Sequence, residues 1–113
     1  MFSDDRCGGS SNFTDVPKNL AVYAGSDCVL KCAISDNSFP LGWKKNSTEV
    51  YTGYEFSNPF NSTGRFEIIQ EKNRTYMYNL RIRHAQPSDA GEYECGRNVP
   101  EVASAQLVII GKS

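Results

Sequence analysis

Near its C-terminal end the chain reads Asp89-Ala90-Gly91-Glu92-Tyr93-Glu94-Cys95. From Glu92 onward polar and apolar residues alternate, and successive side chains of a strand point to opposite faces of a sheet. We therefore predict a strand that buries Tyr93 and Cys95 and turns Glu92 and Glu94 outward.

Short alternating segments of the same kind recur along most of the chain. Residues 28–34 place Cys28, Leu30, Cys32 and Ile34 on one face. Others lie at residues 19–23, 41–45, 49–52, 65–69, 76–82 and 105–109, separated by turn residues. No segment shows a convincing helical period. Short strands at this spacing predict an all-β sandwich or barrel.

The composition is typical of one globular domain. The chain has 113 residues, of which 39% are hydrophobic and 22% charged. Twelve basic and thirteen acidic side chains leave a net charge of −1, which argues against binding to nucleic acid. No apolar run is long enough to span a bilayer, so we expect no direct membrane insertion by this chain.

Cysteines and glycosylation sequons point to an extracellular protein. The cysteines are an even set whose spacings fit no zinc pattern, and His84 is the only histidine, so we expect no metal and no cofactor. Paired cysteines and several sequons in one short domain favour an oxidising compartment. Candidate N-glycosylation sites are Asn12, Asn46, Asn61 and Asn73.

Taken together, three segments resemble an immunoglobulin-superfamily domain. Residues 25–32 are similar to the family's second strand, Trp43 stands where the third strand has its buried tryptophan, and residues 89–95 are similar to the D-x-G-x-Y-x-C signature. The resemblance covers about residues 13–111 and implies a two-sheet immunoglobulin β-sandwich with a V-type Greek key. We expect residues 1–12 to be a flexible leader and residues 112–113 a tail.

The resemblance also implies structural roles. A Cys32–Cys95 disulfide would tie the two sheets together and contribute about 4 kcal/mol through chain entropy. Trp43 would fill the space beside the sulfurs, and Tyr93 would be the corner tyrosine whose hydroxyl bonds to the backbone. The distance between the cysteines leaves room for two extra short strands after Trp43, which favours a variable-type (V-set) arrangement.

We expect two further interactions, one ion pair and one additional disulfide. Arg65 and Asp89 match the Arg–Asp ion pair at one end of V-set sandwiches. Cys28 shares the inward face, and Cys7 is the remaining partner for it. We expect a Cys7–Cys28 bond, although Cys7 should precede the first strand at the opposite end of the sandwich. A free or intermolecular Cys7 is the alternative.

Several families of function are disfavoured. The last strand lacks the F-G-x-G bulge of antibody and T-cell-receptor variable domains, so a rearranged antigen receptor is disfavoured. Sialic-acid-binding members carry an arginine on the sixth strand and dispense with its cysteine, whereas this chain keeps Cys95. Arg97 is an alternative candidate for such a sialic-acid-binding arginine. Neither a nucleophile motif nor a phosphate-binding loop is present, and we interpret His84 as an exposed residue at a strand end. We therefore expect that the protein is not an enzyme.

The resemblance implies protein recognition through the exposed front sheet, formed by the third, fourth, sixth and seventh strands. We expect cell adhesion or immune-type receptor binding, homophilic or heterophilic, with a homodimer as one form. The ectodomain of a membrane protein is favoured over a soluble secreted protein. Two alternatives stay open: a secreted immune domain that binds a microbial or glycan ligand, and a passive spacer in an intracellular array. The sequons argue against the spacer.

Alternation predicts which side chains this face presents. Lys44 beside Glu92 and Glu94 would form a mixed-charge patch able to meet its own copy around a two-fold axis. Tyrosines flanking Gly53 would add contact area at low entropy cost. A merely solvated sheet face is the alternative, and a glycan on Asn46 would crowd its rim. The candidate partner-binding residues are Lys44, Tyr51, Tyr54, Glu92, Glu94, Arg97 and Gln106.

Overall fold

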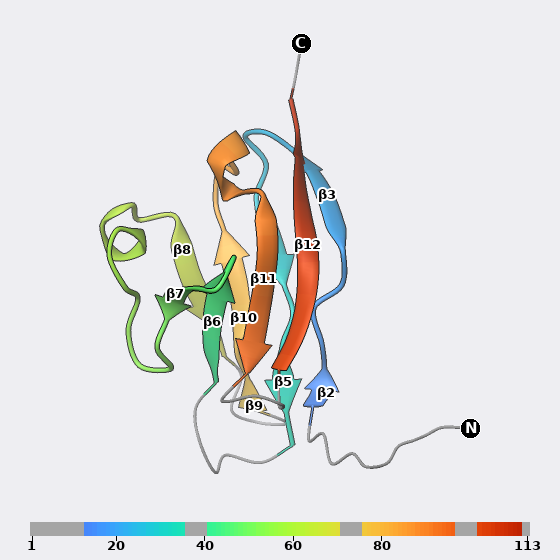
Figure 1. The fold of residues 1–113 in the computed structure, drawn as a ribbon, viewed down its shortest axis with the longest axis vertical. Helices are drawn as coiled ribbons and strands as arrows, with labels where there is room; N and C mark the ends of the chain where they lie inside the picture. Colours follow the sequence, from blue (N-terminus) through green and yellow to red (C-terminus); the bar gives the residue numbers. More distant parts are fainter. Residues whose placement is uncertain (1–12, 36–40, 71–75, 97–101, 112–113) are drawn as a thin grey trace, which may run out of the picture.

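Strands make up most of the described part of the chain, which comprises residues 13–35, 41–70, 76–96 and 102–111 of a computed structural model (Figure 1). The two helices in these ranges are single 3-10 turns, and neither has the length and apolar character needed to cross a membrane. In chain order the elements are β2 (Phe13–Asp15), β3 (Leu20–Tyr23), β4 (Cys28–Leu30), β5 (Ala33–Ile34), β6 (Gly42–Lys45), β7 (Thr48–Tyr51), η2 (Phe60–Ser62), β8 (Phe66–Ile69), β9 (Tyr76–Met77), β10 (Asn79–Ile82), η3 (Pro87–Asp89), β11 (Gly91–Gly96) and β12 (Val102–Ile110).

The front sheet has the order β3-β12-β11-β6-β7, and Figure 1 shows it lying across β10 and β8. The strand β12 runs antiparallel to β11 and parallel to β3, so a segment near the start of the chain completes the sheet beside its last strand. Trp43, Tyr93 and Leu107 are buried on its inner side, whereas Lys44 and Glu92 are exposed. The predicted alternation of this sheet is confirmed.

The back layer consists of the strand sets β4-β10-β8 and β2-β5-β9. Leu30 pairs with Leu80 and Ala33 pairs with Met77, so both sets continue one antiparallel register. The layer is interrupted only where Lys31 and Cys32 face Tyr78 and Asn79. Together with the front sheet it forms the predicted all-β sandwich, which is thereby confirmed.

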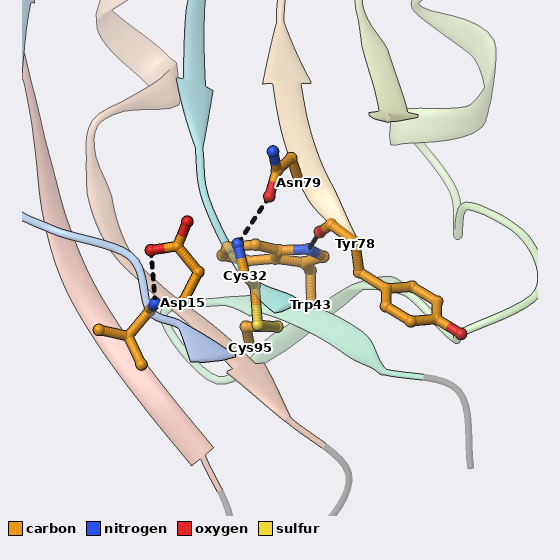
Figure 2. The surroundings of a disulfide bond; sticks show 7 residues. Asp15, Cys32, Trp43, Tyr78, Asn79 and Cys95 are labelled. Atoms are coloured by element: carbon orange, nitrogen blue, oxygen red, sulfur yellow. Dashed lines mark hydrogen bonds between the residues drawn. A yellow bond between two sulfur atoms is a disulfide. The ribbon is translucent and has the colours of Figure 1, made fainter. Parts of the chain in front are cut away.

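A competition for one carbonyl explains the interruption (Figure 2). The buried indole N–H of Trp43 donates to the carbonyl oxygen of Tyr78 at 2.7 Å. In a regular antiparallel pair that oxygen would accept the N–H of Cys32. The Cys32 N–H instead donates to Oδ1 of the buried Asn79 at 2.8 Å. The other half of the pair survives, since the Tyr78 N–H donates to the Cys32 carbonyl at 2.7 Å.

The expected Cys32–Cys95 disulfide lies at this point and joins the two sheets, with 6.5 Å between the Cα atoms. Both sulfurs and the Trp43 indole are fully buried. Cys95 also pairs with Trp43 across β11 and β6, so the disulfide and the indole share one layer of the core.

The end of the sandwich that carries η3 is held by Arg65. Its guanidinium donates to both carboxylate oxygens of the buried Asp89, at 2.8 and 3.1 Å, as the resemblance implied. It also donates to the carbonyl of Arg83 at 3.1 Å. The hydrogen bond to Asp89 raises the pKa of Arg65. The Tyr93 hydroxyl donates to the Asp89 carbonyl at 2.6 Å, which is the contact expected of a corner tyrosine.

Only one of the two extra strands expected after Trp43 forms, namely β7. Residues 52–65 instead hold an isolated bridge between Tyr51 and Phe56, followed by η2. Gly53 adopts φ 107°, which turns the chain away from the sheet, and Pro59 has no N–H for a ladder. The prediction of a second strand was therefore wrong.

The expected Cys7–Cys28 bond is not formed, because Cys28 is a free, buried thiol. Phe13 pairs with Ile34 whereas Cys28 pairs with Ile82, so the described start of the chain lies at the other end of the back layer. Cys7 lies outside the described residues. So do Asn12, Asn73, Arg97, the leader at residues 1–12 and the tail at residues 112–113, and the domain boundaries therefore stay a prediction.

The indole contact and the Asn79 contact should be energetically coupled. We expect Asn79→Ala to lower the free energy of unfolding by about 1–3 kcal/mol, because the buried Cys32 N–H loses its acceptor. In a Trp43→Phe background the Tyr78 carbonyl no longer accepts the indole N–H and can accept that of Cys32, so Asn79→Ala should cost markedly less. Urea denaturation of the double-mutant cycle measures the coupling. Asn61→Ala, at an exposed site, is the control, and additive effects would contradict this account.

Cys28 should make the fold sensitive to alkali. Burial, helped by the negative charges of Asp89 and Asp27, raises the pKa of this thiol from 9.0 to about 11. Below pH 9 the thiol is protonated in both states, and between pH 9 and 11 only the unfolded chain ionises it. We expect wild type to lose about 1–2 kcal/mol more stability than Cys28→Ala across that window. Denaturation curves at pH 9 and pH 11 measure the loss of stability for both proteins. Equal losses for wild type and Cys28→Ala would contradict this prediction.

Candidate partner-binding face

Charged side chains form one row across the outer side of the front sheet. Lys44 on β6 pairs with Glu94 on β11 and with Glu49 on β7. The ion pairs of the described residues all involve Arg65, Arg81 or Arg83, so Lys44, Glu49 and Glu94 form no ion pair among those residues. The Glu49 carboxylate accepts the Ser57 hydroxyl at 3.2 Å. Glu49, Lys44 and Glu94, called the charged row below, are therefore available to a partner.

A second line of outward residues flanks the charged row toward η3. Glu92 is paired with Gln106 across β11 and β12, and both are exposed. The backbone N–H of Gln106 donates to Oδ1 of Asn19 at 2.9 Å, which holds β12 beside the segment that leads into β3. The structure thus brings Lys44, Glu92, Glu94 and Gln106 onto one face, as predicted.

Toward the opposite end the described strands carry small residues at two neighbouring positions. Gly42 pairs with Gly96, and Gly96 pairs with Val102, which is 38% exposed. A Cβ at position 42 would lie 2.7 Å from the carbonyl oxygen of Tyr51, a distance that real contacts essentially never show. Gly42 is therefore needed for β7 to approach β6. Gly42 and Gly96, called the floor below, add no side chains beside the charged row.

Tyr54 lies in the turn that follows β7, with 81% of its surface exposed. The backbone of Thr52 in the same turn adjoins position 42. The hydroxyl of Thr52 accepts the N–H groups of Tyr54 and Glu55, each at 3.1 Å. The Thr52 N–H donates to the Glu55 carbonyl at 2.9 Å. These bonds order the turn that presents Tyr54, so an exposed aromatic ring is held ready for contact at low entropic cost.

Tyr51 lies differently from the prediction. Alternation from Glu49 would turn it outward, but the register of β6 and β7 shifts between Lys44 and Trp43 and pairs Tyr51 with the inward Trp43. Its ring packs 4.8 Å from that of Phe56 at the margin of the core. Burial raises the pKa of Tyr51. Tyr51 is therefore only partly exposed, and its role as a contact residue stays a prediction.

The outer side of β4-β10-β8 has a different character because its charges pair with one another. Arg81 contacts Asp27 at 3.2 Å and Glu67 at 3.9 Å, and Arg83 contacts Glu67 at 2.7 Å. The His84 N–H and Arg81 both hydrogen-bond Asp27 and lower its pKa. This network was not predicted from the sequence, although the outward alternation of Arg81 and Arg83 is its signal.

An apolar corner was also missed. Val108 pairs with Ala21, and Ile110 pairs with Tyr23, all on the outer side where β12 runs beside β3. Tyr23 is 56% exposed and Val108 50%. The sequence indicates this corner through alternation, because residues 21 and 23 point to the side of the strand opposite to Leu20 and Val22.

The remaining candidates divide by location. Asn46 lies in the β6–β7 turn and Asn61 on η2, and both are exposed. Within residues 13–35, 41–70, 76–96 and 102–111 no group of three or more His, Cys, Asp or Glu side chains could hold a metal ion.

The sandwich, its inter-sheet disulfide and its corner tyrosine define an immunoglobulin-type domain. Residues 15–107 match the family model of the immunoglobulin V-set domain, and the chain belongs to this family. It is 26% identical over 103 residues to limbic system-associated membrane protein from Gallus gallus, covering 88% of this chain and 29% of that protein. It is 30% identical over 83 residues to smooth muscle myosin light chain kinase from Gallus gallus, covering 73% of this chain and 4% of that protein.

Solved structures share the fold. The first immunoglobulin domain of Dpr1, crystallised bound to that of DIP-eta, has a TM-score of 0.72 at 19% identity, covering 87% of this chain and 93% of that chain. Domain D1 of Duf (Kirre) has a TM-score of 0.72 at 17% identity, covering 89% and 97%. Domain I10 of titin has a TM-score of 0.65 at 24% identity, covering 86% and 94%.

The tight approach at Gly42 gives a direct test of how the charged row is built. We expect Gly42→Ala to lower the free energy of unfolding by about 1–3 kcal/mol, because the new methyl group overlaps the backbone of β7. Gly111→Ala is the matched control, since nothing lies within 4 Å of a Cβ there. Thermal denaturation compares the two, and an unchanged Gly42→Ala variant would show that β7 can shift freely.

Proposed function

We propose that this domain is an extracellular protein-recognition module that binds its partner through the front sheet, in cell adhesion or immune-type receptor contact. V-set domains are non-enzymatic recognition modules, and the family together with its membrane-associated relative supports adhesion or recognition at a general level. The observation that carries the proposal is the contrast between the two sheets. The charges of the back layer pair with one another, whereas the charged row does not.

The front sheet also has the parts that protein interfaces use. Tyr54 is an exposed aromatic anchor beside a floor formed by Gly42 and Gly96, where a partner can approach the backbone closely. The charged row gives orientation, because opposite charges must align across an interface. The ectodomain of a membrane protein is the setting that we propose.

Both homophilic and heterophilic partners suit this face. A two-fold axis between β6 and β11 would set Lys44 opposite Glu94 of a second copy, twice over. Among the described residues this face carries Glu49, Glu92 and Glu94 against Lys44, so a partner surface with excess positive charge also complements it. The muscle-kinase relative and the titin-like structural neighbours support the spacer alternative. However, a spacer does not need an exposed aromatic anchor such as Tyr54.

The double variant Tyr54→Ala/Glu94→Lys tests the proposal. We expect it to weaken binding at least about tenfold, because it removes the aromatic anchor and reverses one charge of the row. Self-association is measured by analytical ultracentrifugation, and heterophilic binding by adhesion of domain-coated beads to cells.

The control is Lys31→Glu, which reverses an exposed charge outside the front sheet. It should leave binding unchanged. If the double variant stays folded and binds as wild type does, the front sheet is not the site.

A further inference from the structure

Asn46 occupies an unusual place in the front sheet. It follows β6 in the turn to β7, where Asn46 and Ser47 adopt φ values of 49° and 71°. Its N–H donates to the carbonyl of Glu92 at 2.8 Å, and its Oδ1 accepts the N–H of Glu92 at 3.0 Å. The Asn46 side chain therefore extends the pairing of β6 with β11 and lies directly beside Glu92.

The amide nitrogen of Asn46 has a different environment from the amide oxygen. Within the described ranges no hydrogen bond involves Nδ2. A Cβ at position 91 would lie 2.8 Å from Nδ2 and 3.0 Å from Oδ1, so Gly91, with φ 151°, leaves room for the Asn46 amide to lie against the backbone of β11. Asn46, Ser47 and Thr48 are all exposed and form an N-x-T sequon. The turn thus offers the nitrogen for substitution while the oxygen holds β11.

We propose that Asn46 carries an N-linked oligosaccharide that covers the η3 end of the front sheet and directs the partner to the opposite end. The donor is a lipid-linked oligosaccharyl diphosphate. A bond forms between Nδ2 and the anomeric carbon, the bond from that carbon to the phosphate oxygen breaks, the lipid diphosphate leaves, and Nδ2 gives up one proton. Oδ1 is untouched, so its hydrogen bond with the Glu92 N–H survives the modification.

The position of the turn determines what the sugars cover. Neighbouring strands lie about 4.8 Å apart, so an oligosaccharide of several rings extends over more than one strand. Glu92 adjoins Asn46, and Gln106 is the next residue across the sheet, so both lie under it. Gly42 is at the far end of β6 from the turn (Figure 1), and the floor it forms with Gly96 stays open.

Asn61 provides the matched comparison. It is another exposed sequon asparagine, but it lies on η2, between β7 and β8 in the chain and apart from β11 and β12 (Figure 1). We expect a glycan there to leave Glu92 and Gln106 uncovered. Glycosylation of these two sites therefore has different consequences for the front sheet.

Mass spectrometry of the whole chain, secreted from animal cells, tests the modification. Thr48→Val destroys the sequon and leaves Asn46 and its contact with Glu92 in place. Ser47→Gly keeps the sequon and suits the positive φ of that position. We expect Thr48→Val to lose the mass of one glycan and Ser47→Gly to keep it. Equal masses for Thr48→Val and wild type would overturn the proposal.

Binding tests the shielding, which rests on the proposed front-sheet function. We expect Thr48→Val and enzymatically deglycosylated wild type to associate several-fold more strongly than glycosylated wild type. Asn61→Gln should change nothing. The shielding alone is refuted if loss of the Asn46 glycan leaves association unchanged while Tyr54→Ala/Glu94→Lys still weakens association. If that double variant binds normally, the front-sheet function fails, while the mass measurement still decides the modification.

Discussion

The hydrogen bond from the Trp43 indole to the carbonyl of Tyr78 is the constraint around which both sheets are arranged. A buried indole N–H needs an acceptor, and it takes the one that the Cys32 N–H would have used. Asn79 then supplies the replacement from the neighbouring residue. The back layer breaks at this point, and the disulfide crosses to the front sheet at the same residue, Cys32.

The same buried layer determines where the exposed residues of the front sheet lie. Cys95 and Trp43 pair with each other and point into the core, so their chain neighbours Glu94 and Lys44 pair on the outer side. The disulfide and the indole therefore position the backbone that carries the charged row without touching its side chains. A partner thus meets strands that are already arranged, and the entropic cost of binding is confined to ordering the charged side chains.

The two outer surfaces use the same kinds of side chains to opposite effect. Arg81 and Arg83 lie within reach of carboxylates on adjacent strands, so most of the charge on the back layer is neutralised locally. In the charged row Lys44 is in register with two glutamates but forms no ion pair with either, and Glu92 adds a third acidic group on the same face. The front sheet thus keeps an electrostatic pattern that a partner can complement, and the turn at Asn46 borders that pattern at one end.

The sequence by itself determined the features that depend on period-two alternation and on the cysteine, tryptophan and tyrosine pattern. These include the inward Trp43, Tyr93 and Cys95 and the outward Lys44, Glu92 and Glu94. Only the tertiary structure decided whatever depends on register or on competition for a hydrogen bond. The register shift between β6 and β7 turned Tyr51 inward, although alternation alone placed it outside. Asn79 became structural because a distant indole occupied a carbonyl, and Asn46 joined the front sheet because Glu92 faced it. Alternation is a property of one strand, whereas register and acceptor competition arise only when segments far apart in the chain meet.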